Sequence, residues 1–201
     1  MLIGIGLGPG DKELLTLRAV RLLKEADKVF VPGKMAKDLV APYTEAEVLE
    51  FPMSNDEDVI RAALERNAER IAPAARNGTA VLGMIGDPSF YSTFSRQVEI
   101  MRASHPDIET EVEPGISSIT AFASRAKLAI NGGFVVTDGE HPDAMIMLKV
   151  KKPGELMRSL QKEGYREFVL AERVFQDEER IYSGEQIPEQ SDYFSIMYAR
   201  K

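Results

Sequence analysis

Residues 1–11 read MLIGIGLGPGD, a short apolar run that leads into a loop rich in glycine and proline. An apolar strand followed by glycines is typical of α/β proteins that bind a ligand at the end of a strand. We expect a strand over residues 2–6 and, from the apolar stripe over residues 14–26, a helix after the loop. The stretch therefore predicts an α/β fold and raises the question of which ligand the loop receives.

The glycines of this loop do not match a dinucleotide-binding fingerprint. G-x-G-x-x-G requires a third glycine, and that position holds Pro9 in one register and Asp11 in the other. The second predicted strand, residues 28–31, also lacks an acidic residue at its end for a ribose, and no Walker A pattern occurs. The residues by themselves leave a plain turn open as the alternative, with Asp11 accepting hydrogen bonds from the first amides of a helix.

Strand and helix patterns alternate through the first 128 residues. Further strands are expected at 79–85 and 108–112, and helices at 54–76, 90–103 and 116–127, with Pro73 expected to bend or end the first of these helices. This alternation predicts a mostly parallel sheet. After Asn131-Gly132-Gly133 the pattern becomes richer in strands, at 134–137, 144–150, 167–173, 180–183 and 193–199, with one helix at 153–163.

We therefore expect two α/β domains. Residues 1–128 are predicted to form the N-terminal one around a mostly parallel sheet, and residues 129–201 a smaller C-terminal one around a mixed sheet. A cleft between two such domains is the default place for a ligand.

The composition excludes several classes of protein. A net charge of −7 over 201 residues disfavours a nucleic-acid partner, and no apolar run approaches the roughly 20 residues of a membrane helix. With no cysteine and two histidines, we expect neither a disulfide nor a protein-bound metal. No secretory signal pattern is present, so a cytoplasmic location is expected. His105, before Pro106, is expected in a surface-like turn with a structural role, and His141 in a loop.

Three later segments place polar residues or glycine after predicted strands. Residues 86–93 read GDPSFYST, in which Asp87 is kept out of the helical region by the proline that follows it. Residues 113–118 read EPGISS, and residues 145–150 read MIMLKV with the single lysine Lys149. Taken singly, each has a plain structural explanation: an Asx turn, a helix cap and a core strand with a charge at its edge.

Taken together and in this order, the segments resemble the tetrapyrrole (corrin and porphyrin precursor) methyltransferases that use S-adenosylmethionine. The matching motifs are GLGPGD at 6–11 with LTLRA at 15–19, ADKV at 26–29, GDP at 86–88 and PGISS at 114–118. GDPSFYSTF and LKV are similar to the subgroup that methylates C-20 of precorrin-2 or cobalt-factor II. Leu148 in place of a methionine, and KLAI at 127–130 in place of a Pro-Leu element, depart from that pattern on the expected substrate side.

The resemblance implies transfer of a methyl group to C-20 of precorrin-2 or cobalt-factor II in cobalamin biosynthesis, with S-adenosylhomocysteine as product and usually by a homodimer. Cobalt, if present, would arrive within the substrate. A methylase of the same fold that acts at another ring position, or on a non-tetrapyrrole acceptor, is the alternative. The donor contacts that the resemblance implies are Pro9, Gly86, Asp87, Phe90, Ser92, Thr93, Ser117, Ser118, Leu148, Ala171 and Ile196. Of these, Asp87 is expected to orient its own loop rather than to bind the donor through its side chain.

The sequence gives fewer signals for the residues that contact the methyl acceptor than for those that contact the donor. Tyr91 and Thr93 are the candidates for contact with the substrate, and thus for a catalytic role, with helix packing as the alternative. Methyl transfer to an electron-rich macrocycle needs alignment and exclusion of water rather than a nucleophilic side chain, and the sequence identifies no base for the departing proton. A polycarboxylate acceptor requires local cations. The candidates are Lys34, Lys37, Arg96, Arg125, Lys127 and Lys149.

Overall fold

A computed structural model describes all 201 residues and divides the chain into two compact units, Met1–Ile130 and Asn131–Lys201. Each unit is described by itself. No helix in either unit is long and apolar enough to cross a membrane.

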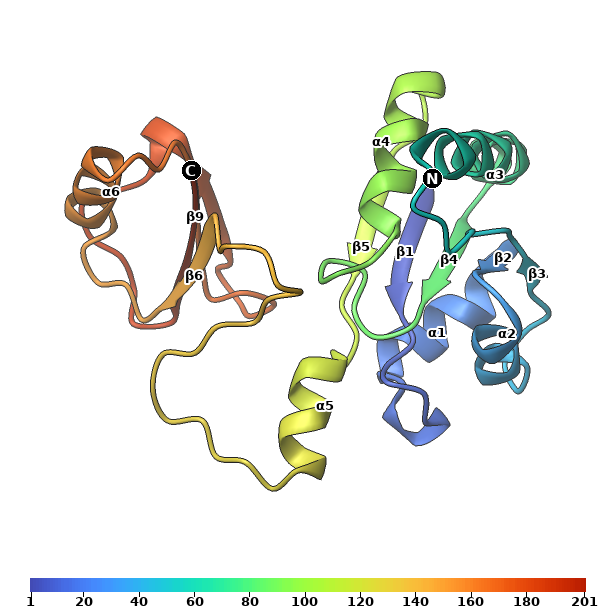
Figure 1. The fold of residues 1–201 in the computed structure, drawn as a ribbon, viewed down its shortest axis with the longest axis horizontal. Coiled ribbons are helices and arrows are strands. Elements are labelled where there is room, and N and C mark those ends of the chain that lie inside the picture. Colours follow the sequence, from blue (N-terminus) through green and yellow to red (C-terminus); the bar gives the residue numbers. More distant parts are fainter. The chain divides into compact units, whose positions relative to one another are not determined.

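The first unit is built on a five-stranded sheet in which every pairing is parallel. Its strands are β1 (Leu2–Gly6), β2 (Lys28–Val31), β3 (Glu47–Val48), β4 (Ala80–Met84) and β5 (Thr110–Glu113). They lie in the order β3-β2-β4-β1-β5, so that β1 is flanked by β4 and β5 (Figure 1). The helices are α1 (Leu17–Glu25), α2 (Lys34–Val40), α3 (Glu57–Asn77), α4 (Phe94–Ser104) and α5 (Ser118–Arg125), with a short 3-10 turn η1 (Lys12–Leu14).

The two faces of this sheet carry separate cores because successive side chains of a strand point to opposite sides. Leu2 of β1 belongs to the core that α3 and α4 cover, whereas Ile3 and Ile5 belong to the core that α1 and α2 cover. Gly4 lies on the α4 face, where the ring of Phe94 occupies the space that a side chain at Gly4 would need. The N-terminal sheet is therefore parallel and covered by helices on both faces, as its pattern predicts.

The helix boundaries differ from the predicted ones in ways that have local causes. The expected start of α3 at Ser54 is wrong, because Asp56 caps the helix and its Oδ1 accepts from the backbone N of Asp58 at 3.0 Å. Pro73 does not end the helix, which continues to Asn77, whose side-chain amide donates to the carbonyl of Pro73 at 2.9 Å. The short α2 and β3 were not predicted, since a seven-residue helix and a two-residue strand leave little periodicity to detect.

The expected surface position of His105 is also wrong. Its side chain is buried at the end of α4, where Nδ1 lies 3.0 Å from an Arg76 nitrogen and Nε2 lies 3.3 Å from a Glu69 oxygen. The turn is buried because α3 and α4 pack against one another at this point, a long-range contact that the sequence does not reveal.

The second unit is a four-stranded sheet with one helix on one face. Its elements are β6 (Ala144–Leu148), α6 (Pro153–Lys162), β7 (Glu167–Glu172), β8 (Arg180–Ser183), the 3-10 turn η2 (Gly184–Gln186) and β9 (Ser195–Arg200). The strand order is β6-β9-β7-β8 and all pairings are antiparallel, which corrects the predicted mixed sheet. The core that α6 covers contains Leu170 and Met197, whereas the alternate positions of the strands face the other way (Figure 1).

The strand predicted at 134–137 is not formed. Between α5 and β6 the chain has no helix or strand, and Phe134, Val135 and Val136 are exposed. The hydroxyl of Thr137 instead closes a turn, accepting from the backbone N of Gly139 and donating to the carbonyl of Glu140. The run has the composition of a strand, but neither of the two sheets includes it.

Candidate functional site

The connections of the parallel sheet reverse direction between β1 and β4. The helices after β1 and β2 pack on one face and lead toward β3, while the helices before and after β4 pack on the other face and lead toward β5. Open α/β sheets bind ligands at the carboxyl ends of the strands at such a reversal. Three loops meet there, which we call the switch-point loops: residues 7–16 after β1, 85–93 after β4 and 114–117 after β5.

Glycine backbones join these loops closely. Gly8 donates its N–H to the carbonyl of Gly86 at 3.2 Å and accepts from the N of Gly86 at 2.7 Å, so the first two loops form an isolated antiparallel bridge. The third loop packs against both of its neighbours, because a Cβ at Gly115 would lie 2.6 Å from the Cα of Gly6 and 2.5 Å from the carbonyl oxygen of Gly86. Only residues without a side chain allow this approach.

Asp87 ties the second loop to the third. Its side chain is buried, with 8% of the residue exposed. Oδ1 accepts from the backbone N of Ser89 at 2.8 Å, and Oδ2 accepts from the backbone N of Gly115 at 3.0 Å. Both carboxylate oxygens therefore accept from backbone amides, which fits the expectation that Asp87 orients the loops.

The hydroxyl groups around these loops fall into two kinds. Ser117 caps α5 by accepting from the backbone N of Ile119 at 3.3 Å, and Ser92 accepts from the backbone N of Phe94 at 3.2 Å. The Thr93 and Ser118 hydroxyls have no hydrogen-bond partner in the chain. Among the four candidate hydroxyls at positions 92, 93, 117 and 118, those of Thr93 and Ser118 are thus the ones that form no bond within the chain.

Apolar side chains of the candidate set are exposed beside the loops. Phe90 is half-exposed, and Tyr91, with 65% of its surface exposed, has a positive φ of 49°. Left-handed backbone is uncommon for an aromatic residue and marks positions that the surrounding structure holds in place. Pro9 is half-buried between Gly8 and Gly10. These residues give the switch-point loops an apolar surface as well as a polar one.

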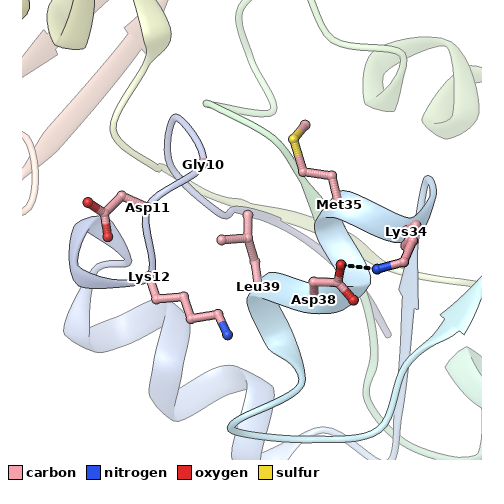
Figure 2. A pocket seen from close by; sticks show the side chains of 7 residues that line it. All are labelled: Gly10, Asp11, Lys12, Lys34, Met35, Asp38 and Leu39. Carbon is pink, nitrogen blue, oxygen red and sulfur yellow. Dashed lines mark hydrogen bonds and ion pairs between the residues drawn. The ribbon is translucent and has the colours of Figure 1, made fainter.

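An open hollow of about 650 Å³ lies between the first loop and α2. Its lining residues are Gly10, Asp11, Lys12, Lys34, Met35, Asp38 and Leu39. Figure 2 shows the Lys12 side chain extending toward α2, whereas the carboxylate of Asp11 points away from it. The sequence singled out only Lys34 among the hollow's cations, and Lys34 pairs with Asp38 one turn later in the helix. Lys12 and Met35 were missed because no motif marks them.

The three candidates of the second unit form one row across its sheet. Leu148 of β6 pairs with Ile196 of β9, which pairs on its other side with Ala171 of β7. The row lies on the face that α6 does not cover, and Leu148 is 67% exposed. The structure thus brings together three residues that are distant in sequence, on an apolar stretch of the uncovered sheet face.

The candidate cations differ in whether they already have an acidic partner. Lys34 pairs with Asp38, and Arg96 pairs with Glu57. The other four form no ion pair and are exposed: Lys37, Arg125, Lys127 and Lys149. An exposed ion pair contributes little to stability and exchanges readily, so pairing alone does not remove Lys34 or Arg96 from the candidates.

Glu113 places a buried charge at the end of β5, directly before the third loop. Its side chain is 8% exposed, and Oε2 lies 2.9 Å from the Nε of Arg18 on α1. Burial raises the pKa of the Glu113 carboxyl above its ordinary value, although Arg18 and Arg21 act in the opposite direction. No group of three or more histidine, aspartate or glutamate side chains is arranged to hold a metal ion.

The sequence of this chain is similar to those of known proteins. The family model of the tetrapyrrole (corrin/porphyrin) methylases matches residues 1–186. The chain is 28% identical to a probable cobalt-precorrin-2 C(20)-methyltransferase of Methanocaldococcus jannaschii, over 98% of this chain and 95% of that protein. It is 32% identical to a cobalt-precorrin-4 C(11)-methyltransferase of Priestia megaterium, over 61% of this chain and 45% of that protein.

The fold is similar to solved structures at low sequence identity. A uroporphyrin-III-C-methyltransferase of Thermus thermophilus aligns with a TM-score of 0.52 and 21% identity, covering 100% of this chain and 91% of that one. A diphthine synthase aligns with a TM-score of 0.50 and 19% identity, covering 100% of this chain and 90% of that one. With the family model spanning most of the sequence, this chain belongs to the tetrapyrrole (corrin/porphyrin) methylases, which are S-adenosylmethionine-dependent methyltransferases.

Proposed function

We propose that this protein transfers a methyl group from S-adenosylmethionine to C-20 of precorrin-2 or of its cobalt form, in corrin biosynthesis. The observation that carries the proposal is the match over nearly the full length of both chains to a probable cobalt-precorrin-2 C(20)-methyltransferase. The match to the C(11) enzyme covers only 61% of this chain and 45% of that protein. Differences in acceptor are expected to be encoded in the part that this match does not cover.

The donor would be held by apolar surface and backbone rather than by charge. Within the first unit we assign it to Pro9, Gly86, Phe90, the hydroxyls at positions 92, 93, 117 and 118, and the backbone that Asp87 positions. Within the second unit we assign it to the row of Leu148, Ala171 and Ile196. The donor supplies a methyl group activated by the positive charge on its sulfur, so these residues need only orient it and exclude water.

The acceptor would approach the same loops from the side that carries Tyr91 and Thr93. Both are exposed on the second switch-point loop, and the Thr93 hydroxyl is unpaired. The hollow beside the first loop adds the cations Lys12 and Lys34 within reach of a carboxylate-rich ring. Displacement at the methyl carbon forms a carbon–carbon bond and leaves the neutral thioether, and the methylated carbon then loses a proton.

The remaining features of the proposal follow the family. We infer a cytoplasmic homodimer that has neither nucleic acid nor membrane as a partner, and domains of residues 1–128 and 129–201. A methylase acting at another ring position, or on an acceptor that is not a tetrapyrrole, remains the alternative function.

The decisive experiment is an incubation with isotope-labelled S-adenosylmethionine and, in parallel, metal-free precorrin-2 and its cobalt form. We expect one methyl group to be added at C-20, which mass spectrometry and NMR would locate. The acceptor that reacts faster would show whether the natural substrate is metal-free or carries cobalt. Transfer to another ring carbon would replace the C-20 proposal. No transfer to either acceptor, with S-adenosylhomocysteine still bound, would move the function to a different acceptor.

The same transfer assay on Tyr91→Phe tests whether the Tyr91 hydroxyl contributes to the reaction. Tyr182→Phe, which removes a tyrosine hydroxyl from the second unit, is the control.

A further inference from the structure

A cation without an acidic partner lies at one end of the second sheet. β6 and β7 both run antiparallel to β9, so they end where β9 begins. We call this region the Lys149 edge. It comprises the last residue of β6 and the one after it, Leu148 and Lys149, the corresponding Glu172 and Arg173 of β7, and residues 192–195 before and at the start of β9.

Two residues with left-handed backbone hold the start of β9 from both sides. Lys149 has a φ of 59° and donates its backbone N–H to the carbonyl of Ser195 at 2.8 Å. Arg173 has a φ of 53° and donates in the same way to the carbonyl of Phe194 at 2.8 Å. Residues other than glycine adopt this conformation infrequently, and it is maintained where the neighbouring structure determines it. The backbone at both residues, and so the direction in which each side chain leaves it, is therefore set by the fold.

The two cations then differ in their partners. The guanidinium of Arg173 is neutralised by Asp192, with nitrogen–oxygen distances of 2.8 and 2.9 Å, and Asp192 in turn donates its backbone N–H to Glu172 at 2.9 Å. Lys149 forms no ion pair, although the chain has 32 acidic and 25 basic residues. Its ammonium lies 5.4 Å from the centre of the Tyr193 ring. A cation on an aromatic face retains its charge and hydrogen-bond donors for a further partner.

The surface beside Lys149 is apolar and flat. Tyr193 is half-exposed and packs edge-to-face on Phe194, with ring centres 5.4 Å apart. Leu148, directly before Lys149, and its pairing partner Ile196 are exposed on the face that α6 leaves uncovered. Because Leu148 and Ile196 are assigned to the donor, the exposed Tyr193 and Phe194 rings are the apolar surface left beside the Lys149 ammonium, and they suit a conjugated molecule with carboxylates at its periphery.

We propose that Lys149, oriented by Tyr193, binds a carboxylate of the tetrapyrrole acceptor and thereby contributes to acceptor specificity. The inference rests on the proposed function and adds to it a carboxylate site on the second unit. The donor also carries a carboxylate, that of its methionine part, so the test must distinguish the two ligands. A charge-assisted hydrogen bond to a carboxylate is among the stronger single polar contacts, and its loss is measurable as affinity.

The test uses the full chain and two probes in separate titrations. Metal-free uroporphyrin, which carries eight carboxylates, is followed by fluorescence, and S-adenosylhomocysteine is followed by calorimetry. The variants are Lys149→Gln, Lys149→Arg and the control Lys151→Gln, which removes the same charge from an exposed lysine two positions away. Lys149→Gln retains the backbone bond to Ser195, and its melting temperature is expected to equal that of the wild type.

We expect Lys149→Gln to weaken uroporphyrin binding by about tenfold, with Lys149→Arg within about threefold of the wild type and Lys151→Gln unchanged. The Lys149→Gln defect should shrink at high salt, while the dissociation constant of S-adenosylhomocysteine stays constant. Equal binding by Lys149→Gln and wild type, an equal loss in Lys151→Gln, or a loss confined to S-adenosylhomocysteine would overturn the inference and leave the proposed function standing. A wild type that binds S-adenosylhomocysteine but no uroporphyrin would also overturn the inference, while the transfer assay with precorrin-2 decides the proposed function separately.

Discussion

The switch-point loops of the first unit and the Lys149 edge of the second differ in what their polar groups do. In the loops, both oxygens of Asp87 accept from backbone amides, and Ser117 caps a helix. At the edge, Lys149 contacts only an aromatic ring, and the neighbouring apolar residues are exposed. The comparison teaches that Asp87 and Ser117 hold the backbone of the loops, whereas Lys149, unlike Glu172, Arg173 and Asp192 beside it, keeps its charged group available for recognition. Substitutions in the loops should therefore reduce stability and binding together, while Lys149→Gln should reduce binding alone.

The largest effect is expected from Gly115→Ala. The new methyl group would meet backbone atoms of Gly6 and Gly86, which cannot move without opening the junction of the three loops. We expect a loss of about 3 kcal/mol in the free energy of unfolding and no detectable binding of S-adenosylhomocysteine. Denaturant unfolding and calorimetry measure the two quantities.

Gly132→Ala is the matched control, because a Cβ there meets no atom within 4 Å. It should leave both quantities unchanged. A Gly115→Ala protein as stable as the wild type would mean that the loops are not packed as described.

A smaller effect is expected from Asp87→Asn. The amide nitrogen of asparagine cannot accept, so one of the backbone amides of Ser89 and Gly115 loses its partner. We expect a loss of about 1–3 kcal/mol in stability and a parallel fall in affinity for S-adenosylhomocysteine. Asp138→Asn, which makes the same change in an exposed turn, should cost less than about 0.5 kcal/mol. Unchanged stability with lost affinity would instead indicate that Asp87 contacts the donor directly.

The smallest effects concern pH, and they have opposite signs in the two units. Burial raises the pKa of Glu113, so the folded state holds its proton more tightly than the unfolded state does. The stability of the wild type relative to Glu113→Gln should therefore fall as pH rises from the ordinary value of 4.5 through the folded-state pKa. Denaturant unfolding of the wild type and of Glu113→Gln across this pH range measures the difference in their free energies of unfolding.

Glu189 of the second unit provides the opposite case. Arg158 forms two bonds of 2.6 and 2.8 Å with Glu189 and lowers the pKa of its carboxyl. The wild type should gain stability relative to Glu189→Gln as pH rises from the folded-state pKa to the ordinary value of 4.5, and lose it again on acidification. If the stability difference changed with pH in the same direction for both glutamates, the burial assigned to Glu113 and the ion pair assigned to Glu189 could not both be correct.

Much of the first unit was predictable because its signals are local. The alternation of apolar runs and helical stripes indicated β1, β4 and the parallel sheet, and the Pro-Gly segments correctly marked loops that follow strands. The strand expected at 134–137 illustrates the opposite case, since β-type composition alone does not supply a neighbouring strand. His105 was misplaced for a related reason, because its burial depends on a helix packed from elsewhere in the chain.

The sequence by itself determined the α/β class and the membership in the methylase family, and it located the glycine- and proline-rich loops after the strands. Glycine and proline in these loops are required by the local backbone, and such requirements are visible in a motif. Only the tertiary structure decided that Asp87 holds Gly115, that β9 lies between β6 and β7, and that Tyr193 lies under the ammonium of Lys149. These are contacts between residues distant in the chain, and no periodicity or motif specifies which distant residues will meet.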